Sequence, residues 1–235
     1  MDKEALKFEV FTSVACFKTP FSIRGVETYP LPPYSTVIGF LYKALGRKYK
    51  GQKFSLSVQG DYKAIFRDYL TFRKYNLDKK RLEKKPIEVP FLYSFKLVAH
   101  LLGSKEILNL FERALRRPAS YLGLGLREIP AKIGKVKRVK IKWTSLEDPV
   151  ELKYNAYIPI ELAKNLDFFS NERGDKYFTG FEGIEYILPS FIKKISWYRD
   201  FEYEQVVYIP KGVEIEEDSE VLIDEEGDFV FPTGG

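Results

Sequence analysis

The sequence of 235 residues contains very few of the side chains on which metal, redox and acid–base chemistry usually depend. Its one cysteine, Cys16, excludes an intrachain disulfide and any site built from several thiolates. Its one histidine, His100, excludes a multi-histidine metal site and a two-histidine acid–base pair. The sequence also lacks a P-loop, a nucleophile elbow and a metalloprotease helix. We therefore predict no metal, no cofactor and no catalytic residue set.

Long apolar runs are missing as well. Without a stretch of about 18 apolar residues, no ordinary membrane-spanning helix is expected, and a membrane is not a predicted partner. The N-terminus has no basic segment followed by an apolar one, which predicts a cytoplasmic protein. Hydrophobic residues make up 45% of the chain, enough for an ample globular core. Abundant Lys and Glu with few Gln, Cys and Met are typical of thermophiles.

Charge is distributed unevenly along the chain. The net charge is +5, but residues 200–235 contain twelve Asp and Glu against one Lys, and residues 1–199 carry +16. A basic body favours a polyanionic partner such as nucleic acid, although a merely solvated basic surface has the same composition. The acidic runs at residues 216–218 and 224–226 are typical of solvated faces, and the acidic end is also suited to a protein partner.

Apolar periodicity predicts two helices in the first part of the chain. The first follows Pro33, with Ser35 or Thr36 expected as its N-cap and Gly46 as its end. The second begins after Ser104, which is expected to cap it. Strand patterns precede and follow each helix, so the order is β-α-β, a polar insertion, then β-α-β. This is the order of a ferredoxin-like α+β fold.

The predicted domain organisation follows from these patterns. Residues 1–145 contain the ferredoxin-like unit, and residues 146–235 are expected to form a smaller β-rich C-terminal region. His100 ends an apolar strand and Cys16 lies in another, so both are expected to be packed rather than reactive.

Three segments are candidates for nucleic-acid binding, since single-stranded RNA bases stack on aromatic rings while Lys and Arg hold phosphates. The first is the aromatic and basic stretch 69–93, for which a hairpin with a charged solvent-exposed tip is an equally plain interpretation. Its basic candidates are Arg73, Lys74, Lys79, Lys80, Arg81, Lys84 and Lys85. The second is the glycine loop, with Tyr121, Gly123 and Gly125. The third is the entry to the first helix, with Ser35 and Thr36 flanked by Lys18, Arg24 and Arg47.

Two of these segments resemble motifs of CRISPR-associated protein family five, of the RAMP superfamily. Residues 30–41, Pro-Leu-Pro-Pro-Tyr-Ser-Thr-Val-Ile-Gly-Phe-Leu, are similar to the family's proline-rich helix entry. Residues 119–128, Ala-Ser-Tyr-Leu-Gly-Leu-Gly-Leu-Arg-Glu, are similar to its Tyr-Leu-Gly-Arg-Ser-Glu segment, with the arginine displaced to Arg127. The resemblance covers residues 6–145 and implies an RRM-like RAMP domain with an inserted β-hairpin, the thumb, at about residues 72–91.

The resemblance also implies a function. It implies a subunit of the type I CRISPR interference complex Cascade that caps the 5′ handle of mature crRNA, with Gly123 and Gly125 against that handle. Arg127 is a further candidate for RNA binding. The implied protein partners are the backbone-forming subunit and the large subunit. We expect a non-catalytic protein. The alternatives are a metal-independent endoribonuclease that processes precursor crRNA, as in type I-C systems, and an interaction scaffold without an RNA role.

Overall fold

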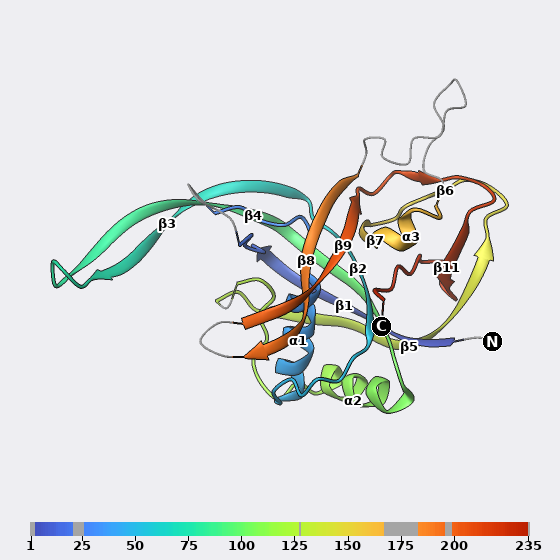
Figure 1. Ribbon diagram of the computed structural model, residues 1–235, viewed down its shortest axis with the longest axis horizontal. Coiled ribbons are helices and arrows are strands. Elements are labelled where there is room, and N and C mark those ends of the chain that lie inside the picture. The colour runs from blue at the N-terminus through green and yellow to red at the C-terminus, as the bar shows by residue number, and fades with distance from the viewer. Residues whose placement is uncertain (1–2, 21–25, 127, 167–182, 196–198, 235) are drawn as a thin grey trace, which may run out of the picture.

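The chain folds into a mixed structure in which a few helices accompany a large, mostly antiparallel sheet (Figure 1). The computed structural model describes residues 3–20, 26–126, 128–166, 183–195 and 199–234. The helices are α1 (Tyr34–Leu45), α2 (Lys105–Arg116) and the short α3 (Ile160–Ala163). The strands are β1 (Lys3–Ala15), β2 (Ser55–Asp61), β3 (Ala64–Asn76), β4 (Arg81–Leu102), β5 (Ala131–Ser145), β6 (Val150–Glu151), β7 (Asn155–Pro159), β8 (Ile184–Ile195), β9 (Arg199–Ile209), β10 (Glu214–Ile215) and β11 (Glu220–Asp224).

Nine strands belong to one sheet. Its order is β11-β5-β1-β4-β2-β7-β9-β8, and β3 pairs with β4 off this path. The short strands β6 and β10 form a separate ladder. Strands from residues 146–235 therefore extend the sheet that β1 to β5 begin, and the division of the chain at residue 145 stays a prediction.

The two long helices begin and end for local reasons. Gly46 has a left-handed backbone and donates its N–H to carbonyls of the last turn of α1, as its sequence position predicts. Ser104 caps α2 by accepting a hydrogen bond from the N–H of Ile107, which confirms the second predicted cap. The predicted cap of α1 is wrong. The helix already begins at Tyr34, and Pro33, whose fixed φ suits a helix entry, stands at the N-cap without a side-chain hydrogen bond.

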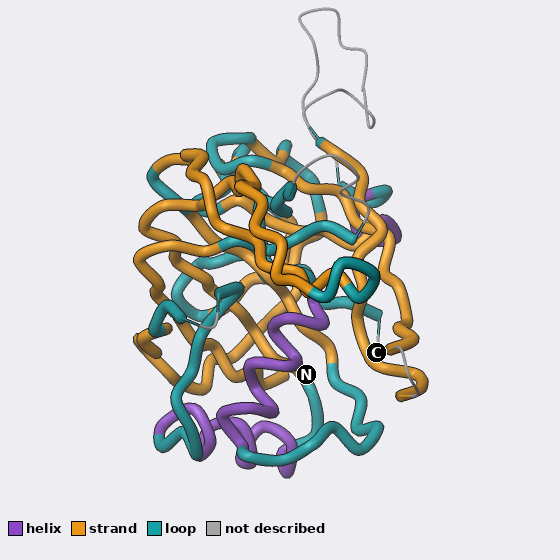
Figure 2. Tube along the Cα trace, turned by 90° about the vertical axis from the view of Figure 1, so that its left-hand side faces the viewer, coloured by secondary structure: helices purple, strands orange, loops and turns teal. Residues whose placement is uncertain are grey.

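The main core lies between the sheet and the helices α1 and α2. The apolar face of the central strands contributes fully buried residues such as Phe8 and Leu97. The sheet curls over α1, since β8 contacts this helix and Phe191 stacks on Tyr49 at 5.7 Å between ring centroids. Figure 2 shows α1 and α2 together below the strands. No helix in the described residues is long and apolar enough to cross a membrane.

The other face of the central strands is covered by the C-terminal segment, residues 224–233. This contact is polar as well as apolar. Gln59 donates a hydrogen bond to the carbonyl of Phe229 at 2.6 Å, and Ser57 accepts one from the N–H of Phe231 at 3.0 Å. The backbone N–H of Thr233 donates to the carbonyl of Leu56. The C-terminus is therefore an integral layer of the fold.

Candidate nucleic-acid interface

A long hairpin leaves the body of the protein, and we call it the arm (residues 64–93). Strands β3 and β4 are paired from Ala64 opposite Tyr93 to Asn76 opposite Arg81. The thirteen residues of β3 span about 40 Å, and the arm projects far beyond the remaining fold (Figure 1). The stretch 72–91, expected as a thumb, lies within the arm, and the pairing starts earlier, at Ala64.

The register of the arm sorts its side chains between two faces. Residues directly opposite one another in an antiparallel pair share a face. One face therefore carries two exposed tyrosines, Tyr69 and Tyr75, alternating with Arg67 and Arg73 and opposed by Lys84. Tyr69 is 69% exposed and Tyr75 is 55% exposed. Aromatic rings and cationic side chains thus alternate along one solvent-facing surface.

The predicted basic residues all lie toward the outer end of the arm and are exposed. They are Arg73 and Lys74 on β3, Lys79 and Lys80 at the turn, and Arg81, Lys84 and Lys85 on β4. Lys79 is within 3.3 Å of Glu83, and no other of the seven forms an ion pair within the described residues. The outer arm therefore keeps most of its positive charge available to a ligand.

The base of the arm is joined to two other segments by a small apolar cluster. Val89 and Phe91 of β4 are buried against Cys16, which follows β1, and Leu126 of the glycine loop packs on this cluster. Burial raises the pKa of the Cys16 thiol, so this cysteine is inert, as expected. Lys18 is exposed two residues beyond Cys16, where its backbone bridges to Thr28. The arm, the glycine loop and the end of β1 thus meet.

The glycine loop has both a structural and an accessible part. Gly125 has φ +83°, and a Cβ there would lie 2.9 Å from the carbonyl oxygen of Cys16, so this glycine is required by the packing of the chain itself. Tyr121 is 56% exposed, with the ammonium group of Lys43 5.8 Å from its ring centroid. Gly123, which lies between Tyr121 and Gly125 in the sequence, is half-buried. The groups that a ligand could reach at this loop are therefore Tyr121 and the neighbouring Lys43 of α1.

The third predicted candidate, the entry to α1, is not assembled as expected. Ser35 and Thr36 are half-buried, and the N–H groups of Thr36 and Val37 already donate to the carbonyl of Pro33. Arg47 follows the opposite end of α1, about 18 Å away for a helix of twelve residues, so it does not flank this entry. The predicted residues Arg24 and Arg127 lie outside the described residues.

His100 lies in a buried cluster of charged groups instead of a cleft. It is 0% exposed, and its Nε2 is 3.1 Å from Oδ2 of Asp224. Its Nδ1 has no hydrogen-bond partner, and burial lowers the pKa of the imidazole. A neutral, solvent-excluded histidine of this kind matches the expectation of a packed residue.

Lys7 occupies the centre of this cluster. Its Nζ donates hydrogen bonds to Asp224, Glu226 and Asp228 at 2.5–2.7 Å. The expectation that residues 224–226 form only a solvated face is therefore wrong for Asp224, which is 3% exposed, because the C-terminal segment folds back onto β1. Three carboxylates this close resemble a cation site. Here the ammonium group of Lys7 fills the place that a metal ion would take.

The charges of this cluster change one another's pKa values. Burial alone would raise the pKa of Asp224, but hydrogen bonds from His100 and Lys7 lower it well below its ordinary value. Hydrogen bonds from Lys137 and Lys7 lower the pKa of Glu226 to about 2. Although burial opposes it, the same carboxylates raise the pKa of Lys7. Lys7 and the three carboxylates are therefore ionised at neutral pH, whereas His100 is neutral.

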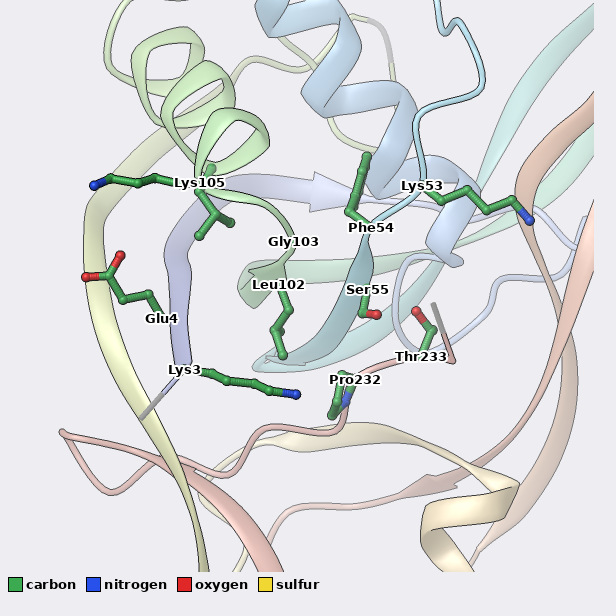
Figure 3. Close-up of a pocket in the computed structure, with 11 residues that line it drawn as sticks. Lys3, Glu4, Lys53, Phe54, Ser55, Leu102, Gly103, Lys105, Pro232 and Thr233 are labelled. Atoms are coloured by element: carbon green, nitrogen blue, oxygen red, sulfur yellow. The ribbon is translucent and has the colours of Figure 1, made fainter. Parts of the chain in front are cut away.

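A pocket of about 860 Å³ lies between β1, β2, α2 and the C-terminal segment (Figure 3). Three lysines line it, but only Lys3 extends across it, toward Pro232, whereas Lys53 and Lys105 point away. Lys53 is already bound to Glu202 at 2.8 Å. Its basic groups do not converge, so we assign no ligand to this pocket.

A model of a known protein family matches most of this chain. The family model described as CRISPR-associated protein (Cas_Cas5) matches residues 5–168, which include the arm and the glycine loop. The chain belongs to this family. A search of curated proteins returned no match.

Solved structures with the same fold are consistent with this Cas5 membership. A chain of a structure described as a "CRISPR RNA-guided surveillance complex" is 13% identical with a TM-score of 0.54, and the match covers 88% of this chain and 91% of that one. A CRISPR protein from Archaeoglobus fulgidus is 14% identical with a TM-score of 0.50, over 99% of this chain and 100% of the other. At this identity the likeness concerns the fold.

Sequence reasoning missed two exposed cations of the candidate interface. Lys43 lies in the last turn of α1 and reaches Tyr121 only because Ala119 and Ser120 bond to carbonyls of that turn. Arg67, which lies 3.6 Å from Glu88, precedes the basic and aromatic stretch 69–93, yet the alternation of residues 67, 69, 73 and 75 places it on the same face of a strand. Strand alternation was therefore a usable signal for Arg67, whereas nothing local pointed to Lys43.

Proposed function

We propose that this Cas5-family chain is a non-catalytic crRNA-binding subunit of a type I CRISPR interference complex, Cascade, in the cytoplasm. In this role it caps the 5′ handle of mature crRNA and contacts the backbone-forming and large subunits. The observation that carries the proposal is the arm, a basic and aromatic hairpin whose base packs against the glycine loop. The sheet order β5-β1-β4-β2, with α1 and α2 as crossovers, supports a ferredoxin-like RAMP domain beneath it.

The distribution of apolar groups on the arm favours binding over a merely solvated tip. A charged hairpin tip needs no large apolar residues, yet Tyr69, Tyr75 and Leu77 are each more than half exposed. Exposed apolar groups on a protruding strand pair are a liability unless they serve a contact. Rings spaced two or more residues apart, with guanidinium and ammonium groups between them, suit the bases and phosphates of a single strand.

The absence of catalysis is part of the proposal. His100, the one imidazole of the chain, is buried against Asp224 and cannot reach an RNA phosphate without unfolding the C-terminal segment. At the glycine loop the exposed groups are Tyr121 and Lys43, and within the described residues neither side chain has a hydrogen bond or an ion pair to a group that could act as its acid–base partner. These observations support a binding role rather than the endoribonuclease alternative.

Incubating the purified protein with end-labelled repeat RNA in EDTA tests the proposal. We expect salt-sensitive binding of the RNA and no cleavage over the time in which the RNA itself is stable. Specific cleavage that is lost in Tyr121→Phe or Lys43→Met would instead establish the endoribonuclease. If the protein does not bind repeat RNA even at low salt, the RNA role is wrong.

Stacking on the arm gives a second prediction. Replacing Tyr69 with leucine is expected to weaken RNA binding by about 1–3 kcal/mol, because a base loses its aromatic platform while the strand keeps an apolar residue. Tyr203 on β9 is similarly exposed, at 60%, and lies outside the arm, so Tyr203→Leu is the matched control and should bind normally. Equal affinities of the two variants, measured by fluorescence anisotropy, would contradict stacking at Tyr69.

A further inference from the structure

A second pocket lies at the end of the molecule opposite to the arm, near β11 and α3 (Figure 1). Its volume is about 510 Å³. It is lined by an indole, an amide, two carboxylates and four apolar residues: Trp143, Asn165, Asp218, Glu220, Leu162, Leu166, Val230 and Phe231. The pocket is separate from the interface described above.

Trp143 is the most unusual feature of this pocket. It is 58% exposed, although its neighbour along the same face of β5, Ile141, is buried. Trp143 is opposite Leu222 in the ladder, and Ser145 is opposite Glu220. Trp143 and Glu220 therefore share a face of the sheet as diagonal neighbours, a separation that long side chains can bridge.

The two carboxylates of the pocket carry uncompensated charge. Within the described residues, neither Asp218 nor Glu220 forms an ion pair, whereas nearby Asp224, Glu226 and Asp228 are all bound to lysines. Asp218 has φ +63°, an uncommon backbone conformation, and its N–H is tied to the carbonyl of Leu146 at 2.9 Å. The fold thus presents two negative charges beside an exposed indole.

We propose that this pocket is a docking site for an arginine side chain of a protein partner. The indole face attracts a guanidinium group, the carboxylates bind its N–H groups, and the apolar lining accepts its methylene stem. Arginine fits better than lysine because its planar group can stack on Trp143 while it bonds to oxygen. The same carboxylates would repel RNA phosphates. The arginine site depends on the proposed function in one respect, which is that a subunit of a complex has protein partners.

The test uses the full-length protein labelled with ¹⁵N and the indole N–H signal of Trp143. The chain has two tryptophans, so Trp143→Phe assigns this signal. We expect N-acetyl-argininamide to shift the signal saturably, and N-acetyl-citrullinamide, its neutral analogue, to leave it unchanged. In Asp218→Asn/Glu220→Gln the affinity for argininamide should fall at least about tenfold, because charge-assisted hydrogen bonds are lost.

A matched variant controls for net charge. Asp148→Asn/Glu217→Gln removes two exposed carboxylates that do not line the pocket, and it should bind argininamide as the unmodified protein does. The inference is overturned if the citrulline compound shifts the signal equally, or if the two double variants bind alike. The RNA assay is independent of this readout. Argininamide binding without RNA binding would overturn the proposed function and leave the pocket intact.

Discussion

Replacing Lys7 with methionine is expected to lower the free energy of unfolding by about 3–5 kcal/mol, as when one partner of a buried ion pair is removed. The Lys7 side chain is 6% exposed, and without it the buried Asp224 has no lysine partner within the described residues, although Glu226 and Asp228 keep Lys137 and Lys153. Methionine keeps most of the volume, so a cavity does not account for the loss. Urea unfolding followed by circular dichroism measures the change.

Lys3→Met is the control for this prediction. Lys3 lies on the same strand and is exposed, so its replacement should change the free energy of unfolding by no more than about 0.5 kcal/mol. A loss below about 1 kcal/mol in Lys7→Met would mean that the cluster contributes little to holding the C-terminal segment.

The pH dependence of stability provides a second readout that needs no variant. The pKa values of Asp224, Glu226 and Asp228 are lowered in the folded protein, that of Glu226 to about 2. As pH falls below about 4, the unfolded chain takes up protons that these folded carboxylates do not, so stability is lost. The lowered pKa of His100 acts in the same direction from about pH 6.5 downward. We expect high stability at pH 7 and a steep decline between about pH 5 and pH 2.

This cluster also explains why the sequence alone did not predict the C-terminal layer. The helix ends at Gly46 and Ser104 follow from a few neighbouring residues, and such signals were sufficient for α1 and α2. Lys7 and Asp224, by contrast, are separated by 217 positions. No periodicity relates them, and the acidic run looks the same whether it is solvated or folded over a buried lysine.

The candidate interface also combines features that local sequence predicts with features that depend on contacts between distant residues. The basic and aromatic character of the arm was visible in the sequence because both come from one continuous stretch. The division of its side chains between two faces depends on the register, which only the pairing of Ala64 with Tyr93 defines. The predicted role of Gly125 depended on what approaches its backbone, and that neighbour, Cys16, comes from another strand. Local composition thus indicated the candidate segments, and tertiary contacts decide which of their atoms are available to a ligand.

Removing positive charge from the arm is expected to have the largest effect on RNA binding. In the variant with Lys79, Lys80, Lys84 and Lys85 all changed to glutamine, the dependence of log K on log salt should become shallower by about 2.8, if each lysine neutralises one phosphate of a single strand. At about 0.1 M monovalent salt this corresponds to a loss of affinity of up to several hundredfold. Anisotropy titrations at four salt concentrations measure both quantities.

The control removes the same number of lysines from another surface. Lys105, Lys135, Lys140 and Lys142, on α2 and β5, are exposed and form no ion pair within the described part of the chain. Their replacement by glutamine lowers the net charge equally, so long-range attraction of RNA is weakened to the same extent in both variants. If direct contact at the arm is responsible, only the arm variant should lose most of its affinity. Equal losses in the two variants would mean that RNA responds to the overall charge of the protein and that the arm is not its binding surface.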